Sequence, residues 1–412
     1  MNSDLQNGAL AGAVAACDAI GAAMLTRLTS RLGEDSGASG NVLACPVGLA
    51  LALATLRAGA ADNGTGIDAM LGVDTDAKTR DRVWSAVQRS LQRFDVADTQ
   101  QLQDFNPEAI PDTPLLHIAN NILAIGQTQP TQDYLGNAKR WYGAEVNRAE
   151  RPKAKAALDA WANLHTGGLI KESAINVTPL TRLVVQNALL FAARWEKHFN
   201  AAATAERQPF TRADGSTSRA DLMSRTGRLT FVTGPDWRAL RLRYVDGAGD
   251  SGSAGGSAAG SETLAMDVIL PRKVSSPIDL PPTTWGEATR RLTAAQTAGT
   301  TTNVHLRLPR LNLSSKPTDL TGVVKSLGVR LGFQDHIAPD LLVGQIVQQV
   351  KLVVAEAGTV AAALTEIKIR TGAPPRPEEP IDFTVDHPYV LRIVDLTSGI
   401  ALIEAAILDP AA

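Results

Sequence analysis

The sequence predicts an α+β protein. Two segments near the N-terminus carry apolar residues at helical spacing, and several later segments have the apolar or alternating composition of strands. These segments do not follow one another in a regular βαβ rhythm, which argues against a doubly wound parallel sheet. With 412 residues, 44% of them hydrophobic, the chain is long enough to bury a large core. We expect one domain that spans residues 1–412.

The N-terminal part predicts two amphipathic helices, over residues 18–32 and 46–57. In both segments apolar side chains recur every three or four residues, so they fall on one helix face. These faces consist of Ile20, Met24, Leu25 and Leu28 in the first helix, and of Val47, Leu49, Leu53 and Leu56 in the second.

Three later segments predict strands. Residues 115–125 and the apolar run 183–191 have the length and composition of strands. Residues 302–313 alternate, which places Val304, Leu306 and Leu308 on one face.

A low-complexity segment interrupts the second half of the chain. Residues 246–261 read DGAGDSGSAGGSAAGS, a composition that is flexible and too poor in apolar side chains to pack. Such a segment marks either a domain boundary or a long hairpin loop. Because strand-like residues flank it at 240–244 and 265–270, we favour the hairpin.

Composition excludes several kinds of partner. A formal net charge of −2 gives no basic field that would attract nucleic acid. We find no run of about 18 apolar residues that would cross a membrane. The N-terminal residues MNSDL lack the positive segment of a secretory signal, which predicts a cytoplasmic protein or an extracellular one whose leader has been removed.

The sequence contains no convincing catalytic or metal-binding motif. Cys17 and Cys45 have neither Cys-x-x-Cys spacing nor a nearby histidine, so we expect two buried free thiols. The six histidines are scattered, and phosphate-binding motifs are missing, so we expect no metal, no cofactor and no catalytic residues. The tetrapeptide around Ser251 resembles the nucleophile segment of trypsin-like proteases. It lies in the low-complexity segment, so a hydrolase that uses Ser251 is only a third hypothesis.

A strand-like run near the C-terminus is followed by a proline-rich segment that cannot form part of a β-sheet. Side chains that alternate from Thr359 divide into two faces. One face is small or apolar and the other ends in charges. Prolines then remove backbone donors, so the strand cannot continue beyond about Gly372. The first face holds Thr359, Ala361, Ala363, Thr365, Ile367 and Ile369; the second holds Val360, Ala362, Leu364, Glu366, Lys368 and Arg370; the prolines are Pro374, Pro375, Pro377 and Pro380.

Motifs over residues 18–410 resemble those of the serpins, in the order that this family shows. They are NVLACP from residue 41 with the helix that follows, Ala119-Asn120-Asn121, KRWYGAEV from 139, WANLHTGGLIKE from 161, VVQNALLFAARWEKHF from 184, PFTRADGST from 209, LPRLNL from 308, and DHPYVLRIVDLTSGIALIEAAILDP from 386. The resemblance implies a fold of three β-sheets with eight or nine helices and an exposed reactive loop, at about residues 356–386.

The resemblance also implies a function. The loop is offered to a serine protease, is cleaved, and inserts into the main sheet while the protease is still acylated. The partner would be a serine protease, and the inhibitor a monomer. The hinge of the loop would consist of Glu356, Gly358, Thr359, Val360, Ala361, Ala362 and Ala363, and the sheet-opening region would include Cys45, Asn187, Gln348 and Trp195.

Two bonds are candidates for cleavage. The usual distance from Gly358 selects Gly372–Ala373, which suits an elastase- or subtilisin-like protease. The side-chain chemistry of Arg370–Thr371 instead suits a trypsin-like protease, whose pocket binds a cation.

Some positions depart from the family pattern. Val360 replaces a usual glutamate, Leu364 is bulkier than expected, and Gln348 stands where a histidine is common. Cys45 and Gly48 replace two serines. The alternative is therefore a non-inhibitory binding or chaperone-type protein whose loop is only a substrate.

Overall fold

The computed structural model describes residues 3–34, 40–61, 65–73, 76–96, 98–106, 110–245, 263–315, 317–332, 334–343, 345–359 and 379–411. This part of the chain forms nine α-helices: α1 (Ser3–Glu34), α2 (Pro46–Leu56), α3 (Ile67–Met70), α4 (Ala77–Leu91), α5 (Gln100–Gln103), α6 (Gln132–Tyr142), α7 (Arg151–His165), α8 (Thr284–Thr297) and α9 (Thr321–Ser326). Three 3₁₀ turns accompany them: η1 (Gln92–Phe94), η2 (Ala201–Ala203) and η3 (Pro277–Asp279).

The described strands form three sheets. The six-stranded sheet has the order β10 (Leu311–Ser314), β13 (Lys351–Ala355), β14 (Gly358–Thr359), β4 (Leu183–Arg194), β2 (Leu115–Ile125), β3 (Glu145–Ala149). The nine-stranded sheet has the order β1 (Val42–Ala44), β17 (Ala401–Ile407), β16 (Tyr389–Asp395), β8 (Leu264–Pro271), β7 (Trp237–Arg243), β6 (Thr217–Thr233), β9 (Thr302–Pro309), β15 (Ile381–Thr384), and β5 (Ala205–Thr211) pairs with β6. A two-stranded sheet joins β11 (Thr318–Asp319) and β12 (Val347–Gln348).

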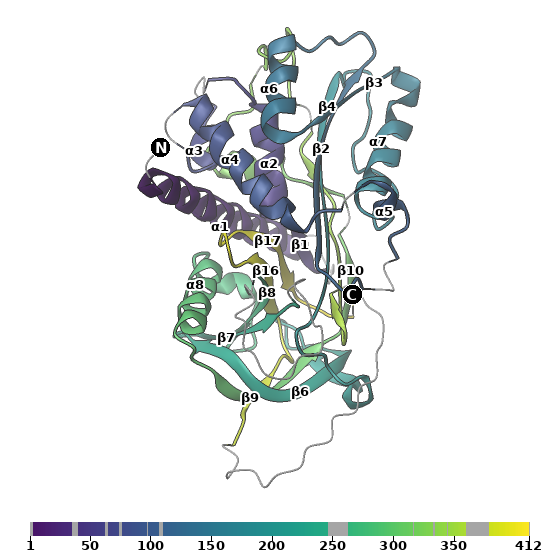
Figure 1. The fold of residues 1–412 in the computed structure, drawn as a ribbon. Helices are drawn as coiled ribbons and strands as arrows, with labels where there is room; N and C mark the ends of the chain where they lie inside the picture. Colours follow the sequence, from purple (N-terminus) through teal and green to yellow (C-terminus); the bar gives the residue numbers. More distant parts are fainter. Residues whose placement is uncertain are drawn as a thin grey trace.

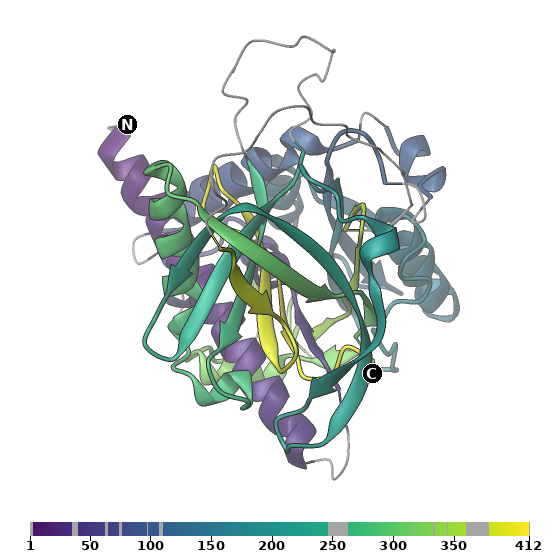
Figure 2. The same ribbon diagram turned by 90° about the horizontal axis from the view of Figure 1, so that it is seen from below.

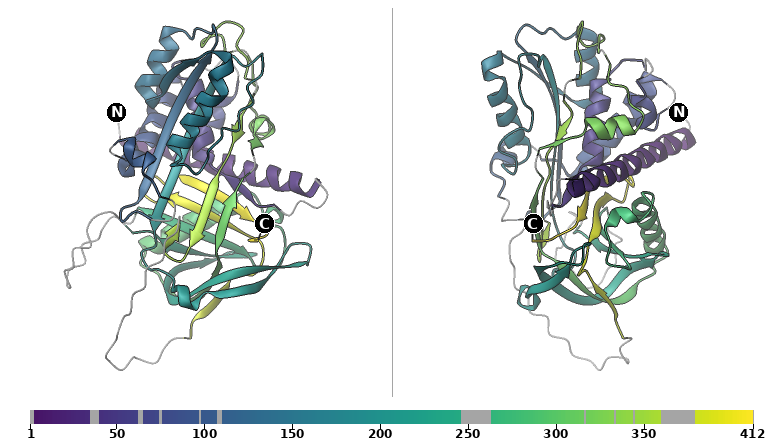
Figure 3. Two further views of the ribbon diagram at one scale, coloured as in Figure 1. Left: turned by 90° about the vertical axis from the view of Figure 1, so that its right-hand side faces the viewer. Right: turned by 180° about the vertical axis from the view of Figure 1, so that it is seen from behind.

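The six-stranded sheet lies between two helical layers. Figure 1 shows β2 and β4 nearly edge-on, with α7 on one face and α2, α4 and α6 on the other. From below, β6 and β9 cross in front of the C-terminal strands β16 and β17 (Figure 2). The two views in Figure 3 show α1 running past the junction between these two parts. The mixture of helices and largely antiparallel strands confirms the α+β prediction.

Most predicted elements form, with changed bounds. The strand predicted at 115–125 is β2, and the run 183–191 lies in β4, which continues to Arg194. The helix predicted at 18–32 is the C-terminal half of the longer α1. The helix predicted at 46–57 is α2, but the prediction of an amphipathic helix is wrong, because ten of its eleven residues are buried. Such burial on all sides marks a core helix.

Two further expectations are decided by strand pairing. The single strand predicted at 302–313 is wrong, because β9 ends at Pro309 and β10 belongs to the other sheet. The hairpin around the low-complexity segment is confirmed, since β7 pairs antiparallel with β8 from Trp237–Pro271 to Arg243–Ala265.

One helix contradicts the expectation that no segment of the chain is apolar enough to cross a membrane. Among the described helices, Gly8–Leu32 of α1 is long and apolar enough to cross a membrane, with 44% of its most apolar window buried. Core helices of soluble proteins and N-terminal signal sequences share this composition. The helix therefore indicates neither a span nor its absence. In the structure it packs against β17, α2 and β1.

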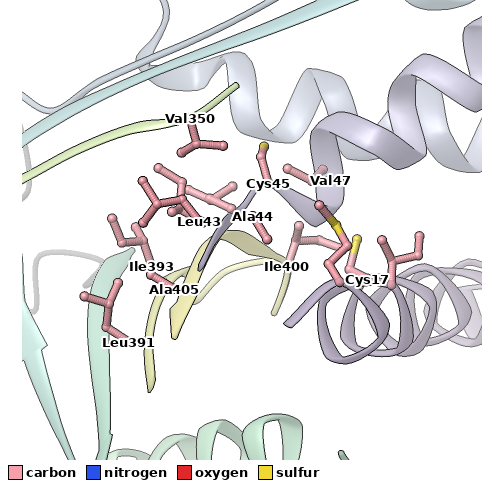
Figure 4. Packing of buried hydrophobic residues seen from close by; sticks show 14 of the residues in the cluster. Cys17, Leu43, Ala44, Cys45, Val47, Val350, Leu391, Ile393, Ile400 and Ala405 are labelled. Atoms are coloured by element: carbon pink, nitrogen blue, oxygen red, sulfur yellow. The ribbon is translucent and has the colours of Figure 1, made fainter. Parts of the chain in front are cut away.

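The main hydrophobic cluster contains residues of both large sheets and of the helices that cover them. Cys17 from α1 and Cys45 at the start of α2 lie in this cluster, next to strands β1, β16 and β17 (Figure 4). Both cysteines are free and buried, as predicted. Burial raises the pKa of the Cys45 thiol to about 12, so it stays protonated and unreactive at neutral pH.

A row of buried charges crosses four neighbouring strands of the nine-stranded sheet. Arg241, Asp267, Arg392 and Glu404 face one another in register on β7, β8, β16 and β17, and each is at most 2% exposed. Arg241 binds Asp267 through two hydrogen bonds of 2.7 and 2.9 Å. Arg392 donates to Glu404 at 2.9 Å and to Asp18 of α1. The alternating signs let these charges stay buried because each has an opposite neighbour.

We expect the stability contribution of Glu404 to depend on pH. Burial raises the pKa of Glu404 to about 7, although Arg392 acts in the opposite direction. The folded state therefore binds a proton more tightly than the unfolded state, so this contribution falls as pH rises from about 4.5 to about 7. Glu404→Gln should remove that dependence, shifting the difference in urea stability from wild type by on the order of 1–3 kcal/mol between about pH 5 and 7.5. An unchanged difference would contradict the assignment.

Candidate functional site

The six-stranded sheet is incomplete at its centre. β4 pairs with β2 over ten residues, from Leu183 to Ala192, on one side. On its other side the described chain supplies only β14, in which Thr359 pairs with Ala193 and Gly358 with Arg194. β14 also pairs with Val354 and Ala355 of β13. Beyond these two residues, no described strand joins β4 to β13.

A cavity of about 480 Å³ occupies the place of the missing strand. Its two walls are residues 182–191, just before and within β4, and residues 345–353, before and within β13. Helix α2 lines it from the core side through Gly48, Leu49 and Ala52, whereas α7 lines it from the outer side through Trp161 and Ala162. The cavity is thus a slot in the sheet, between two helices.

The two residues of β14 already occupy one end of the slot and are well packed there. Thr359 is 2% exposed, and its hydroxyl is 2.7 Å from the hydroxyl of Tyr244. Trp195 stacks on Tyr244 with ring centroids 4.6 Å apart and donates through its indole nitrogen to the carbonyl of Ala355. The backbone nitrogen of Trp195 donates to the carbonyl of Ala357. Both backbone and side-chain hydrogen bonds therefore hold the hinge at the end of β4.

Glycine at position 358 is required by close approach. A Cβ atom there would lie 2.3 Å from the carbonyl oxygen of Ala193 and 2.8 Å from the Cα of Arg194. Both contacts are with backbone, which cannot move without breaking the pairing.

The turn before the hinge is held by Glu356. Its carboxylate accepts hydrogen bonds from Arg310 and from the hydroxyl of Thr204, the latter at 2.7 Å. Burial works to raise the pKa of Glu356, but these hydrogen bonds outweigh it and lower that pKa below the usual glutamate value. The carboxylate is therefore ionised at neutral pH and can hold both donors.

Three of the four predicted sheet-opening residues meet at the slot. The side-chain amide of Gln348 makes two hydrogen bonds with the backbone of Cys45. It accepts from the Cys45 nitrogen at 2.8 Å and donates to the Cys45 carbonyl at 3.0 Å. Asn187 donates instead to Asn120 on β2, at 3.0 Å. All three line the cavity. Trp195 does not join them, because eight residues of strand separate it from Asn187, a distance of about 26 Å.

The remaining predicted residues divide between described and other parts of the chain. Glu356, Gly358 and Thr359 lie at the slot, as given above. Val360, Ala361, Ala362, Ala363, both candidate bonds (Gly372–Ala373 and Arg370–Thr371) and Ser251 fall outside the described residues. At the far end of the predicted loop, β15 pairs parallel with β9.

Residue patterns did not indicate several residues of the site. Tyr244, Arg310 and Thr204 come from three separate parts of the chain, just beyond the ends of β7, β9 and η2. Arg310, in the motif LPRLNL, was the one with a usable signal, since its charge is opposite to that of Glu356.

This arrangement agrees with comparisons to known proteins. A family model described as serpin (serine protease inhibitor) matches residues 22–410. The chain belongs to the serpin family. An uncharacterized serpin-like protein of Thermococcus kodakarensis is 27% identical over 68% of this chain, a match that spans 63% of that protein. The putative serpin-Z8 of Oryza sativa subsp. japonica is 28% identical over 94% of both chains.

A solved serpin structure confirms the predicted fold. Arabidopsis AtSerpin1 in its native stressed conformation superimposes with a TM-score of 0.72 and 19% identity, covering 98% of this chain and 99% of that one. The serpin fold, the three sheets and the number of helices expected from the sequence are thereby confirmed, the last within the described part of the chain. Serpins are in general protease inhibitors, not enzymes.

Gly358→Ala should displace β14 from the slot. The added methyl group would meet the backbone of Ala193 and Arg194, so we expect faster hydrogen exchange of the amides in residues 355–359, by about tenfold or more. The matched control is Gly136→Ala in α6, where no atom lies within 4 Å of the new Cβ. That variant should exchange like wild type at the hinge. Equal exchange in both variants would show that the close approach at Gly358 is unimportant.

Proposed function

We propose that this serpin is a suicide-substrate inhibitor of serine proteases. A protease cleaves the loop at about residues 356–386, and the freed strand fills the slot between β4 and β13 while the protease is still acylated. The observation that supports this most directly is β14, since the first two residues of the inserting strand already pair with both walls. The fold stops short of a complete sheet, with a cavity where the strand would lie.

The pairing at β14 predicts the register of the inserted strand. Each residue forward along the loop moves one residue back along β4. Ile369, ten residues after Thr359, would therefore face Leu183, ten residues before Ala193. Leu183 is the first residue of β4, so residues 358–369 would match all twelve residues of that strand. The alternating pattern of the loop sequence would therefore end at about the residue that reaches the end of β4.

This register also suits the side chains on both walls. Thr365 would lie between Asn187 and Gln348, where its hydroxyl would meet two side-chain amides. On the opposite face Val360 would lie beside Ala192, which is fully buried, so an apolar residue suits this departure from the family pattern. Leu364 would face Ala188, whose small side chain leaves room for it.

Insertion would supply enough free energy to trap a protease. About a dozen new backbone hydrogen bonds, each worth roughly 1 kcal/mol net, contribute on the order of 10 kcal/mol before side chains are buried. The inserted strand would extend about 36 Å from the hinge, the length of β4, and the acylated residue would follow it. The small side chains of Ala361, Ala362 and Ala363 favour rapid insertion, which must outrun hydrolysis of the acyl-enzyme.

The proposed scissile bond is Gly372–Ala373, with Arg370–Thr371 as the alternative. Both bonds lie beyond Ile369, the last residue that β4 can pair, so the register permits either. The protease would be elastase- or subtilisin-like in the first case and trypsin-like in the second. A binding or chaperone-type serpin with a substrate-only loop is the alternative function, and the open slot argues for insertion instead.

Incubation with elastase-, subtilisin-, chymotrypsin- and trypsin-like proteases should give, with at least one, a complex that survives boiling in SDS. The expected bond is an ester between the protease serine and the residue before the cut, which denaturation does not break. Mass spectrometry of the released C-terminal peptide identifies the bond, because it begins at Ala373 or at Thr371. Stoichiometric loop cleavage that leaves every protease active would support the substrate-only alternative.

Two substitutions on opposite faces of the loop strand should separate insertion from cleavage. Thr359→Arg puts a charge at a position that is 2% exposed, so insertion should fail, and the loop-cut variant should melt like the intact one. Glu366→Arg is the control, because alternation places residue 366 on the opposite face, which ends in charges, and wild type already carries a charge there. This variant should retain the large rise in melting temperature after cleavage. If Thr359→Arg retains the same rise, the proposed inserted register is wrong.

A further inference from the structure

Helix α7 is tied to the sheet by a row of four side chains. His117 projects from β2 and His165 ends α7. Nδ1 of His117 is 2.5 Å from Asp95, Nε2 of His117 is 2.9 Å from Nδ1 of His165, and Nε2 of His165 is 3.2 Å from Glu145 on β3. Asp95 follows η1. The row thus joins four segments of the chain beneath the end of α7.

The two histidines are enclosed. His117 is 7% exposed and His165 is 3% exposed. Their rings stack with centroids 5.2 Å apart, and Trp161 of α7 covers His165 with a centroid distance of 4.5 Å. Trp161 also donates to Glu145 at 3.1 Å. Water therefore has little access to the contact between the two rings, whereas the outer carboxylates, Asp95 and Glu145, are 21% and 46% exposed.

Counting protons shows that this row has one preferred charge state. Carboxylates only accept hydrogen bonds, so the contacts to Asp95 and Glu145 each use one imidazole proton. The contact between the rings needs a third proton. Two neutral imidazoles hold only two protons, and two imidazolium ions hold four. The row is fully hydrogen-bonded only when the two rings share three protons, which is one net positive charge between two carboxylates.

We propose that His117 and His165 form a proton-dependent latch, which docks α7 on the sheet with one charged ring and releases it when both rings are charged. With a fourth proton, two N–H groups would face each other across 2.9 Å, and two positive charges would repel in a buried site. Because α7 lines the outer side of the slot, its release would ease insertion of the loop strand; this consequence rests on the proposed function.

The surroundings support this direction. Asp95 and Glu145 are the titratable side chains shown against the pair within the described residues. Hydrogen bonding from His165 lowers the pKa of Glu145, which keeps that acceptor ionised on acidification. Asn147 of β3 also hydrogen-bonds Glu145, and the β4 residue opposite His117 is the apolar Leu190.

Hydrogen exchange of the intact protein tests the latch without any protease. The protection factor of α7, corrected for intrinsic exchange, should fall by about tenfold or more from about pH 7.5 to about pH 5 in the wild type. His117→Gln leaves one ring, which cannot repel a second, so its α7 protection should change less than about twofold. His165→Gln should behave alike, and it replaces His117→Gln if that variant does not fold. His305→Gln, on β9, should show the wild-type fall.

Two results would overturn the proposal: α7 protection in the wild type that does not change with pH, or an equal fall in a folded variant that lacks either histidine. The consequence for insertion is measured separately, as the rate at which loop-cut protein gains thermal stability at the two pH values. If the cut protein never gains stability, the proposed inhibitory function fails, whereas the exchange results still decide the latch.

Discussion

The unmatched inner edge of β4 is the constraint on which the rest of the structure depends. One edge of β4 pairs with β2 over ten residues, but its other edge, which faces β13, pairs with only the two residues of β14 among the described strands. Backbone donors and acceptors along such an edge are ready to pair with a further strand. An edge of this kind in the middle of a sheet, between two helices, is both a cost to the fold and the means of its proposed action.

The residues around the slot lessen that cost without filling it. Gln348 uses its amide to satisfy the backbone of Cys45, and Asn187 turns towards Asn120. The histidine that is common at position 348 is therefore not needed to satisfy these groups, although the amide joins different partners. At the upper end, Glu356 and Tyr244 hold the hinge in place. The polar side chains of Gln348, Asn187 and Glu356 are thus satisfied, whereas the backbone edge of β4 remains open for a further strand.

The remainder of the molecule supplies a firm frame. Four strands of the nine-stranded sheet are joined by the row from Arg241 to Glu404, and Arg392 extends it to α1 through Asp18. Buried charges of this kind fix strand register, since a shift by one residue would leave each without its partner. Movement is therefore expected in the six-stranded sheet and α7, and not in this frame.

The sequence by itself determined the class of fold, the order of the motifs, the strand β2 to the residue, and the alternation that begins at Thr359. These features are local or periodic, and periodicity can be read along one segment. The tertiary structure decided that the hinge already lies between β4 and β13, that Trp195 stands apart from Cys45 and Gln348, and that Arg310 and Tyr244 belong to the site. It also brought His117 and His165 together. The contacts of the site and of the histidine pair join segments 46 to 303 residues apart, and their distances follow from strand register and helix packing, which no local pattern encodes.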